Sequence, residues 1–277
     1  MRLSAVYRLC LRRISVNEIE DNNKNANIKD VLRSMIMTFS IYSKIPMPNI
    51  EWKEENMKYT MCFFPLVGLV HGLIWILWFF VSLKITDSSI FRTLTLAALP
   101  FILDGGIHLD GFLDVNDAIH SYGEPQRKLE IMKDSHIGAF AVIYGIIYIM
   151  LWTAVVSLVN RENVFLSGAM FCLARAMSGV TFVMLKGAKN DGMQHTVSGA
   201  ADNGAVILSS LAYAVLIIAY VMDHAFIKGI ILGAVCVGSA FMYKSYTYKN
   251  FGGITGDTAG WYMQLLIAVL VAVVCIF

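Results

Sequence analysis

Long apolar runs alternate with short polar segments along most of the chain, and this pattern predicts a bundle of membrane-spanning helices. About 20 apolar residues are needed to cross the ~30 Å hydrocarbon layer of a bilayer. The runs are continuous, and only helices or closed barrels satisfy their backbone hydrogen bonds in lipid, so we expect helices. The runs that are long enough to span are 60–83, 138–159, 164–185, 205–222, 226–243 and 261–277.

Two other segments carry weaker helical patterns. Residues 91–103 are apolar but short, and they span only if the helix continues into the flanking residues. Counting them gives about seven transmembrane helices. Residues 30–45 have an apolar face and are followed by Pro46, which stops a helix. This pattern predicts an interfacial N-terminal helix.

The composition agrees with an all-α integral membrane protein. Of the 277 residues, 57% are hydrophobic and 15% are charged, whereas a soluble domain has roughly 25% charged residues. The net charge of +2 gives no indication of nucleic acid as a partner. Residues 1–29 are polar and Asn-rich, which predicts a flexible extension, and residues 30–277 form a single polytopic membrane domain.

The basic residues predict how the bundle is oriented. Most of the 22 Lys and Arg residues lie before residue 60 or in the segments 104–137, 186–204 and 244–260. Alternating helices place these segments on one side of the membrane, and basic loops face the cytoplasm. We therefore expect a cell membrane of the bacterial inner-membrane type, with these polar segments on the cytoplasmic side.

An acidic stripe is the strongest candidate for chemistry. Asp110, Asp114 and Asp117 are spaced i, i+4 and i+7 in a polar loop, and on a helix these positions share one face. Three like charges on one face are stable when a divalent cation binds them, and oxygen ligands favour Mg²⁺. The alternative is a solvated acidic face. Carboxylates against a bilayer are costly, which favours the functional interpretation.

The residues just before the stripe are open to two interpretations. Gly105 and Gly106 suit a helix break that lets the backbone approach a ligand, but they suit a plain turn equally well. His108 fits a general base, a metal ligand or a packing residue.

Three charged residues further along the chain are also candidates. Lys133 suits a point cation for phosphate, and Asp134 suits either a completed metal site or an exposed face shared with Glu130. Arg175 lies inside the apolar run 164–185, where an arginine faces the bundle interior. Its guanidinium suits a phosphate, an aspartate, or a purely structural pair with a carboxylate.

The segment before the last helix is rich in glycine and threonine. Gly253 and Thr255 suit a turn whose N–H groups point at an anion, and Asp257 follows as a further metal ligand. All these acidic residues fall on one predicted side of the membrane. The residues alone thus predict a membrane enzyme that uses Mg²⁺ to handle a phosphorylated substrate.

Three sequence blocks resemble the cobalamin synthase family, also called adenosylcobinamide-GDP ribazoletransferase. The blocks are Gly105–Gly111 followed by Asp114 and Asp117, then Glu130–Ala139, and finally Gly252–Asp257. The resemblance covers about residues 30–277. His136 departs from it, because the family commonly has an arginine there.

The resemblance implies a late step of coenzyme B12 biosynthesis. Members of this family transfer adenosylcobinamide phosphate from adenosylcobinamide-GDP to α-ribazole or its 5′-phosphate, and GMP leaves. The implied cofactor is Mg²⁺, and the implied surroundings are membrane lipid. Whether the protein forms a homo-oligomer stays an open question. The implied residues are His108, Asp110, Lys133, Asp134 and Arg175 as catalytic; Gly105, Gly106, Ser135, Gly253 and Thr255 as substrate-binding; and Asp110, Asp114, Asp117 and Asp257 as metal ligands.

Other classes of membrane protein remain as alternatives. A CDP-alcohol phosphotransferase has Ala-Arg after its first Asp-Gly, and here Asp110-Gly111 is followed by Phe112. Prenyltransferases carry two aspartate motifs of a different form. A cation-coupled transporter places its acidic residues at mid-span, whereas these cluster on one side.

Overall fold

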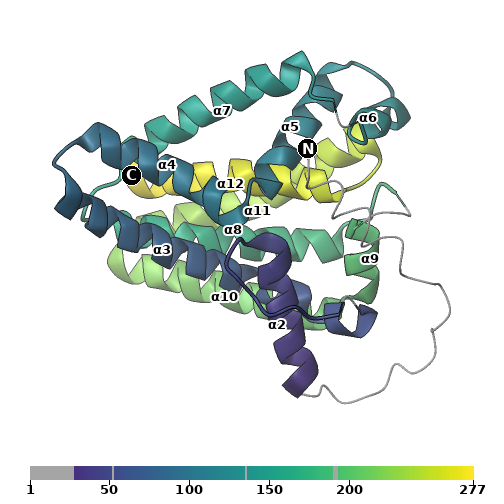
Figure 1. Cartoon of the computed structure of the whole chain (residues 1–277), viewed down its shortest axis with the longest axis horizontal. Coiled ribbons are helices and arrows are strands. Elements are labelled where there is room, and N and C mark those ends of the chain that lie inside the picture. The colour runs from purple at the N-terminus through teal and green to yellow at the C-terminus, as the bar shows by residue number, and fades with distance from the viewer. Residues whose placement is uncertain (1–27, 52, 135, 190–192) are drawn as a thin grey trace.

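The computed structural model describes residues 28–51, 53–134, 136–189 and 193–277, and they fold into a bundle of helices (Figure 1). The predicted extension 1–29 lies outside the described residues except for its last two, which begin the first helix. The helices are α2 (Ile28–Tyr42), η1 (Glu54–Met57), η2 (Thr60–Phe63), α3 (Phe64–Ile85), α4 (Ser89–Asp104), α5 (Ile107–His120), α6 (Pro125–Ile131), α7 (Ala139–Ser157), α8 (Val164–Met184), α9 (Met193–Ala200), α10 (Asn203–His224), α11 (Phe226–Phe251) and α12 (Gly256–Ile276).

The prediction of membrane-spanning helices is confirmed. Among the described residues, six helices are long and apolar enough to cross a bilayer, or up to seven if a bent pair counts as one span. These six match the six predicted runs. The boundaries near the C-terminus were wrong, because α11 and α12 extend through most of the predicted loop 244–260 and leave only residues 252–255 between them. A helix continues beyond its apolar run when its polar side chains reach water.

The seventh apolar run forms only part of a span. Helix α4 has 16 residues and is too short to count as a span by itself. It is long enough only together with α5, and the two helices are bent by 94° relative to each other. Gly105 and Gly106 make this bend with φ angles of 67° and 78°, which glycine adopts without strain. The stretch that contains Asp110 and Asp117 is therefore a helix, α5, and not a loop. Figure 1 shows α5 running across the direction of the long helices.

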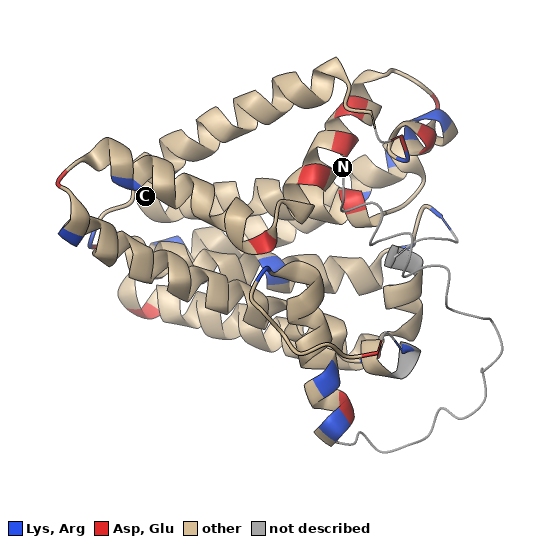
Figure 2. Ribbon diagram, in the orientation of Figure 1, with Lys and Arg blue, Asp and Glu red and all other residues tan. Residues whose placement is uncertain are grey.

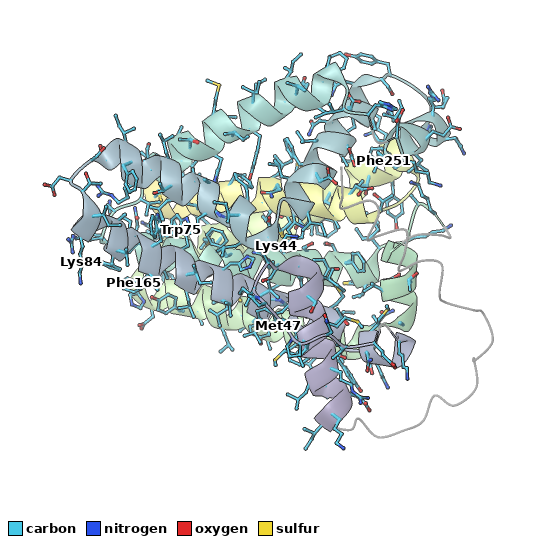
Figure 3. All side chains as sticks on the ribbon, viewed as in Figure 1. Lys44, Met47, Trp75, Lys84, Phe165 and Phe251 are labelled. Carbon is cyan, nitrogen blue, oxygen red and sulfur yellow. The ribbon has the colours of Figure 1, made fainter. Side chains whose placement is uncertain are left out.

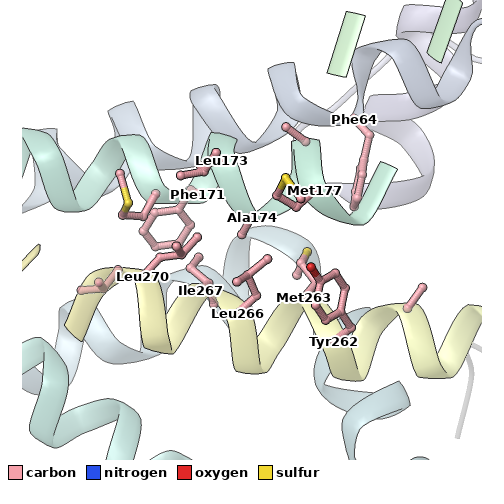
Figure 4. Close-up of a cluster of buried hydrophobic side chains, with 14 of the residues drawn as sticks. Phe64, Phe171, Leu173, Ala174, Met177, Tyr262, Met263, Leu266, Ile267 and Leu270 are labelled. Carbon is pink, nitrogen blue, oxygen red and sulfur yellow. The ribbon is translucent and has the colours of Figure 1, made fainter. Parts of the chain in front are cut away.

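Helix α8 lies at the centre of the bundle, because 89% of its most apolar stretch is buried. Glycines let α3 approach it closely: a Cβ on Gly72 would lie 2.2 Å from the carbonyl oxygen of Gly168. Small residues serve this purpose at helix contacts in membranes. Figure 4 shows the opposite side of α8, where Phe171 and Ala174 face Leu266 and Ile267 of α12.

Helix α2 lies across the long helices (Figure 1) and is attached through buried hydroxyl groups. Ser34 donates to the carbonyl oxygen of Asn56 at 2.8 Å, and Thr38 donates to that of Thr60 at 2.8 Å. Leu32, on the predicted apolar face, is 49% exposed. Phe39 and Tyr42, on the same face, are buried in the bundle at 6% and 8% exposure, so only the first part of this face is exposed, and an interfacial position of α2 stays a prediction.

Charged residues gather toward the two ends of the long helices (Figure 2). Figure 3 places Lys84 and Phe165 at one end and Phe251 at the other. The end near Phe251 also carries α6 and the start of α12, so the predicted polar segments do lie together. Asp104 and Arg175 are exceptions among the described residues, because they lie inside the bundle and are only 4% and 1% exposed.

Candidate functional site

Helices α5 and α12 pack closely enough to bring Asp257 against the acidic face of α5. A Cβ on Gly111 would lie 2.8 Å from the carbonyl oxygen of Asp257 and 2.9 Å from its Cα. One turn away, a Cβ on Gly260 would lie 3.3 Å from the Cα of His108. The first turn of α12 therefore lies beside the first two turns of α5. We call Asp110, Asp114, Asp117 and Asp257 the aspartate site.

The carboxylates of the aspartate site repel one another. Asp114 is partly buried, and the charges of Asp257, Asp110 and Asp117 all act against its ionised form. Lys189 acts in the opposite sense on Asp257. Asp110 is exposed and so is accessible from outside the bundle. The sequence did not single out Lys189, because a lysine in a polar segment carries no specific pattern.

Asp117 also has a structural role. Its carboxylate lies at the N-terminus of α7, where the backbone N–H of Ala141 donates to its Oδ1 at 3.4 Å. Gly138 gives it room, because a Cβ there would lie 2.1 Å from both carboxylate oxygens. A negative charge at a helix N-terminus is stabilising. Asp117 thus couples α5 to α7 at the edge of the aspartate site.

The donor atoms of the aspartate site and their spacing decide which metal ion it suits. Its donors are all carboxylate oxygens, which suit Mg²⁺. Among the described residues, no three acidic, histidine or cysteine side chains lie close enough together to form a ready-made metal site. Mg²⁺ is usually held by one or two carboxylates together with water and substrate phosphates. The residues therefore fit an ion that is shared with a phosphorylated substrate.

The start of α12 is held by its own hydrogen bonds. The hydroxyl of Thr255 caps the helix by accepting from the backbone N–H of Thr258 at 3.1 Å. In return, the hydroxyl of Thr258 accepts from the backbone N–H of Thr255 at 2.8 Å. A Cβ on Gly253 would lie 2.6 Å from the carbonyl oxygen of Lys186. Gly253 and Thr255 therefore position Asp257, and their contact with substrate stays a prediction.

Arg175 lies in the middle of the bundle, surrounded by polar groups that sequence reasoning missed. Its Nη2 is 3.1 Å from Nδ1 of His71, and its Nη1 donates to the carbonyl oxygen of Phe171 at 3.4 Å. The charge of Asp104 stabilises its charged form. We call Arg175, His71 and Asp104 the arginine cluster. The sequence predicted a carboxylate as one possible partner of Arg175, but it did not identify His71 or Asp104.

His108 is buried beside two aromatic rings and does not lie on the exposed face of α5. Its ring is nearly parallel to that of Tyr42, with 8° between the planes and 5.9 Å between the centroids, and it lies 5.8 Å from the ring of Phe64. Among the described residues, its Nε2 has no hydrogen-bond partner. Of the three interpretations of His108, its burial beside these rings fits a packing residue, and its predicted catalytic role stays a prediction.

Lys133 and Asp134 are exposed just beyond the end of α6. Asp134 Oδ1 accepts from the backbone N–H of His136 at 3.0 Å and lies 2.7 Å from its ring Nδ1. Helix α6 is at the same end of the molecule as the aspartate site (Figure 2). A catalytic role for either residue stays a prediction. Ser135, predicted to bind substrate, lies outside the described residues.

The fold and the site define a polytopic helical membrane protein with an acidic centre at one end. The chain belongs to the cobalamin-5-phosphate synthase family, because the model of that family matches residues 34–275. A protein named adenosylcobinamide-GDP ribazoletransferase from Lachnoclostridium phytofermentans is 38% identical over 84% of this chain and 89% of its own length. Relatives of the same name from Clostridium botulinum (strain Alaska E43) and Fervidobacterium nodosum are each 30% identical over 84% of the chain, which is 93% and 92% of their lengths. No solved structure matches.

Proposed function

We propose that this protein is an adenosylcobinamide-GDP ribazoletransferase of cobalamin biosynthesis. It joins the corrinoid phosphate of adenosylcobinamide-GDP to α-ribazole or its 5′-phosphate. A ribose hydroxyl oxygen forms a bond to the phosphorus that carries the corrinoid arm, the bond from that phosphorus to the GMP oxygen breaks, and one proton is released. The observation that carries the proposal is the meeting of Asp257 with the acidic face of α5 in a chain of this family.

Charge neutralisation and positioning are the main requirements of such a phosphoryl transfer. Mg²⁺ held by one or two of the carboxylates of Asp110, Asp114 and Asp257, together with the substrate phosphates, would neutralise the pyrophosphate oxygens as charge moves onto the leaving GMP. The exposed Asp110 would meet the substrate first, and a bound ion would relieve the repulsion that Asp257, Asp110 and Asp117 exert on Asp114. Lys189, whose charge acts on Asp257, lies where it adds a second cation beside the phosphates.

The other predicted site residues are either exposed at the polar end of the molecule or buried within the bundle. Lys133 and Asp134 are exposed, so they are accessible to the bulky corrinoid nucleotide from the polar end. Arg175 is fully buried beside His71, so its action on substrate requires a path into the bundle. The residues predicted to accept the hydroxyl proton are Asp134 and His108.

The orientation of the site is part of the proposal. The aspartate site lies at the end of the bundle that carries most basic segments, and such segments face the cytoplasm. We place the active site on the cytoplasmic side of the cell membrane, where nucleotide substrates are made. A cysteine introduced at Asp110 should react with an impermeant maleimide in inside-out vesicles and not in intact cells.

The test of the reaction uses the full chain in lipid nanodiscs with adenosylcobinamide-GDP, α-ribazole and Mg²⁺. We expect GMP and the joined corrinoid to appear in equal amounts by liquid chromatography and mass spectrometry, and neither to form when α-ribazole is left out. GMP release that does not depend on α-ribazole would instead indicate a hydrolase. A CDP-alcohol or prenyl substrate that is consumed in place of these two would overturn the proposal.

A further inference from the structure

A pocket with a cavity volume of about 60 Å³ and an open mouth lies among α2, α3, α5, α8 and α12. Its inner wall is aromatic and buried, and it includes Tyr42, Phe64, His108 and Phe182. Its lining ends at Gly256 and Asp257, which are exposed and partly exposed. The aromatic pocket therefore opens at the aspartate site.

The rings of the aromatic pocket meet at different angles. Phe64 is tilted by 52° from Tyr42 at 4.6 Å and by 56° from His108 at 5.8 Å, while Tyr42 and His108 are nearly parallel. Aromatic rings attract one another both in offset stacks and edge to face. A flat ring in this pocket would stack on one wall and place its edge against another. The shape of the lining thus selects a planar group.

One polar atom in this wall lacks a partner. Within the described part of the chain, Nε2 of His108 makes no hydrogen bond, although the residue is only 6% exposed. An unpaired buried polar atom costs free energy, which a ligand recovers by supplying the missing partner. A neutral imidazole is able to donate from this nitrogen. The pocket therefore suits a planar group that carries one hydrogen-bond acceptor.

The two substrates of the proposed reaction each bring a planar base. The edge of guanine has several donors and acceptors, whereas the buried wall offers one unpaired polar atom, Nε2 of His108, and the further polar residues of the lining are Tyr42, Ser178 and Asp257. A benzimidazole attached to ribose has a single ring nitrogen that accepts a hydrogen bond. We propose that the aromatic pocket binds the base of the ribazole substrate, with His108 donating to that nitrogen; this rests on the proposed function.

The position of the pocket gives this binding a consequence for the reaction. A base held against Phe64 and Phe182 leaves its ribose at the mouth, beside Asp257. The ribose hydroxyl then faces the phosphates held at the aspartate site. Holding two reactants in this way replaces a bimolecular encounter by an intramolecular one. The aromatic pocket therefore sets both the choice of the base and the direction of attack.

The test is a direct binding measurement with α-ribazole alone, by isothermal titration calorimetry on the full chain in nanodiscs. Phe182→Leu keeps most of the volume but removes the ring. We expect it to weaken α-ribazole binding about tenfold, since stacking of a base on an aromatic side chain contributes that much or more. The KM for adenosylcobinamide-GDP should change less than twofold. The matched control is Phe165→Leu on the same helix, at the far end of the molecule (Figure 3), and it should bind α-ribazole as the unchanged protein does.

A second variant blocks the mouth without disturbing the core. A Cβ on Gly256 meets no atom within 4 Å, so Gly256→Phe should fold and reduce α-ribazole binding at least tenfold. Unchanged affinity in both Phe182→Leu and Gly256→Phe would overturn the proposal, and so would a loss of GMP binding in Phe182→Leu with α-ribazole unaffected. A wild-type protein that releases no GMP contradicts the proposed function itself, whereas release of GMP with unchanged α-ribazole affinity in the variants contradicts only the pocket.

Discussion

The aspartate site and the arginine cluster are both charged regions within an apolar bundle, but their charges are arranged differently. In the arginine cluster, Arg175 has Asp104 as an opposite charge and His71 as a hydrogen-bond partner. In the aspartate site, Asp114 is surrounded by three further carboxylates. Opposite charges held together attract one another, whereas like charges held together repel one another and would be stabilised by a bound cation. From this comparison we predict a structural role for the arginine cluster and a catalytic role for the aspartate site.

Breaking the arginine cluster should have the largest effect. Removing one partner of a buried charged pair costs about 3–5 kcal/mol, because the other charge stays buried without compensation. We expect Arg175→Met to lower the free energy of unfolding by about this amount, measured by denaturation with SDS in mixed micelles. Adding Asp104→Asn should restore a large part of the loss. An Arg175→Met protein of normal stability that has lost activity would place Arg175 on the substrate instead.

Asp110→Asn should affect activity rather than stability. Removing one electrostatic partner of a transition state lowers the rate by about 10²–10³-fold, and the same loss is expected in kcat for GMP release. Because Asp110 is exposed, the unfolding midpoint should stay unchanged. The matched control is Asp223→Asn. Asp223 lies in the last turn of α10, and its side chain is 85% exposed. Equal activity of the two variants would argue against a catalytic role for the stripe.

Separating α5 from α12 should have an intermediate effect. In Gly111→Ala the new Cβ would lie 2.8 Å from the backbone of Asp257, which cannot move aside without shifting α12. A displacement of this kind costs roughly 10–100-fold in kcat/KM. Gly238→Ala on α11 has free space around its Cβ and should be neutral or slightly stabilising. If Gly111→Ala is fully active, the contact between the two helices does not assemble the site.

Removing the cap of α12 should have the smallest effect. Thr255→Val loses a helix cap, which costs about 1 kcal/mol of stability, while Thr255→Ser keeps it. The unfolding midpoint should therefore fall in the first variant and not in the second. A raised KM in both variants with unchanged stability would show that Thr255 contacts substrate.

The sequence was sufficient to predict the spans and the aspartate stripe, because both depend on local patterns. Continuous apolar runs correctly located six helices, and the spacing of Asp110 and Asp114 placed them on one face. The bend at Gly105 was foreseen only as one of two alternatives, since a glycine pair does not specify which angle the chain takes.

Contacts between distant segments could not be predicted from the sequence. His71 and Arg175 are 104 residues apart, and nothing in either apolar run indicates that they pair. The aromatic pocket likewise draws Tyr42, Phe64 and Phe182 from three helices, and each of these residues alone is an ordinary apolar position. Such sites arise from helix packing, which depends on shape rather than on periodicity.

The central claim is that the aspartate site binds a divalent cation for the transfer reaction. Mn²⁺, a paramagnetic substitute for Mg²⁺, can be titrated into the protein in nanodiscs of uncharged lipid and followed by electron paramagnetic resonance with adenosylcobinamide-GDP present. The account predicts bound Mn²⁺ that is displaced by Mg²⁺, is lost in Asp110→Asn and is retained in Asp223→Asn. Mn²⁺ binding that is the same in both variants would contradict it.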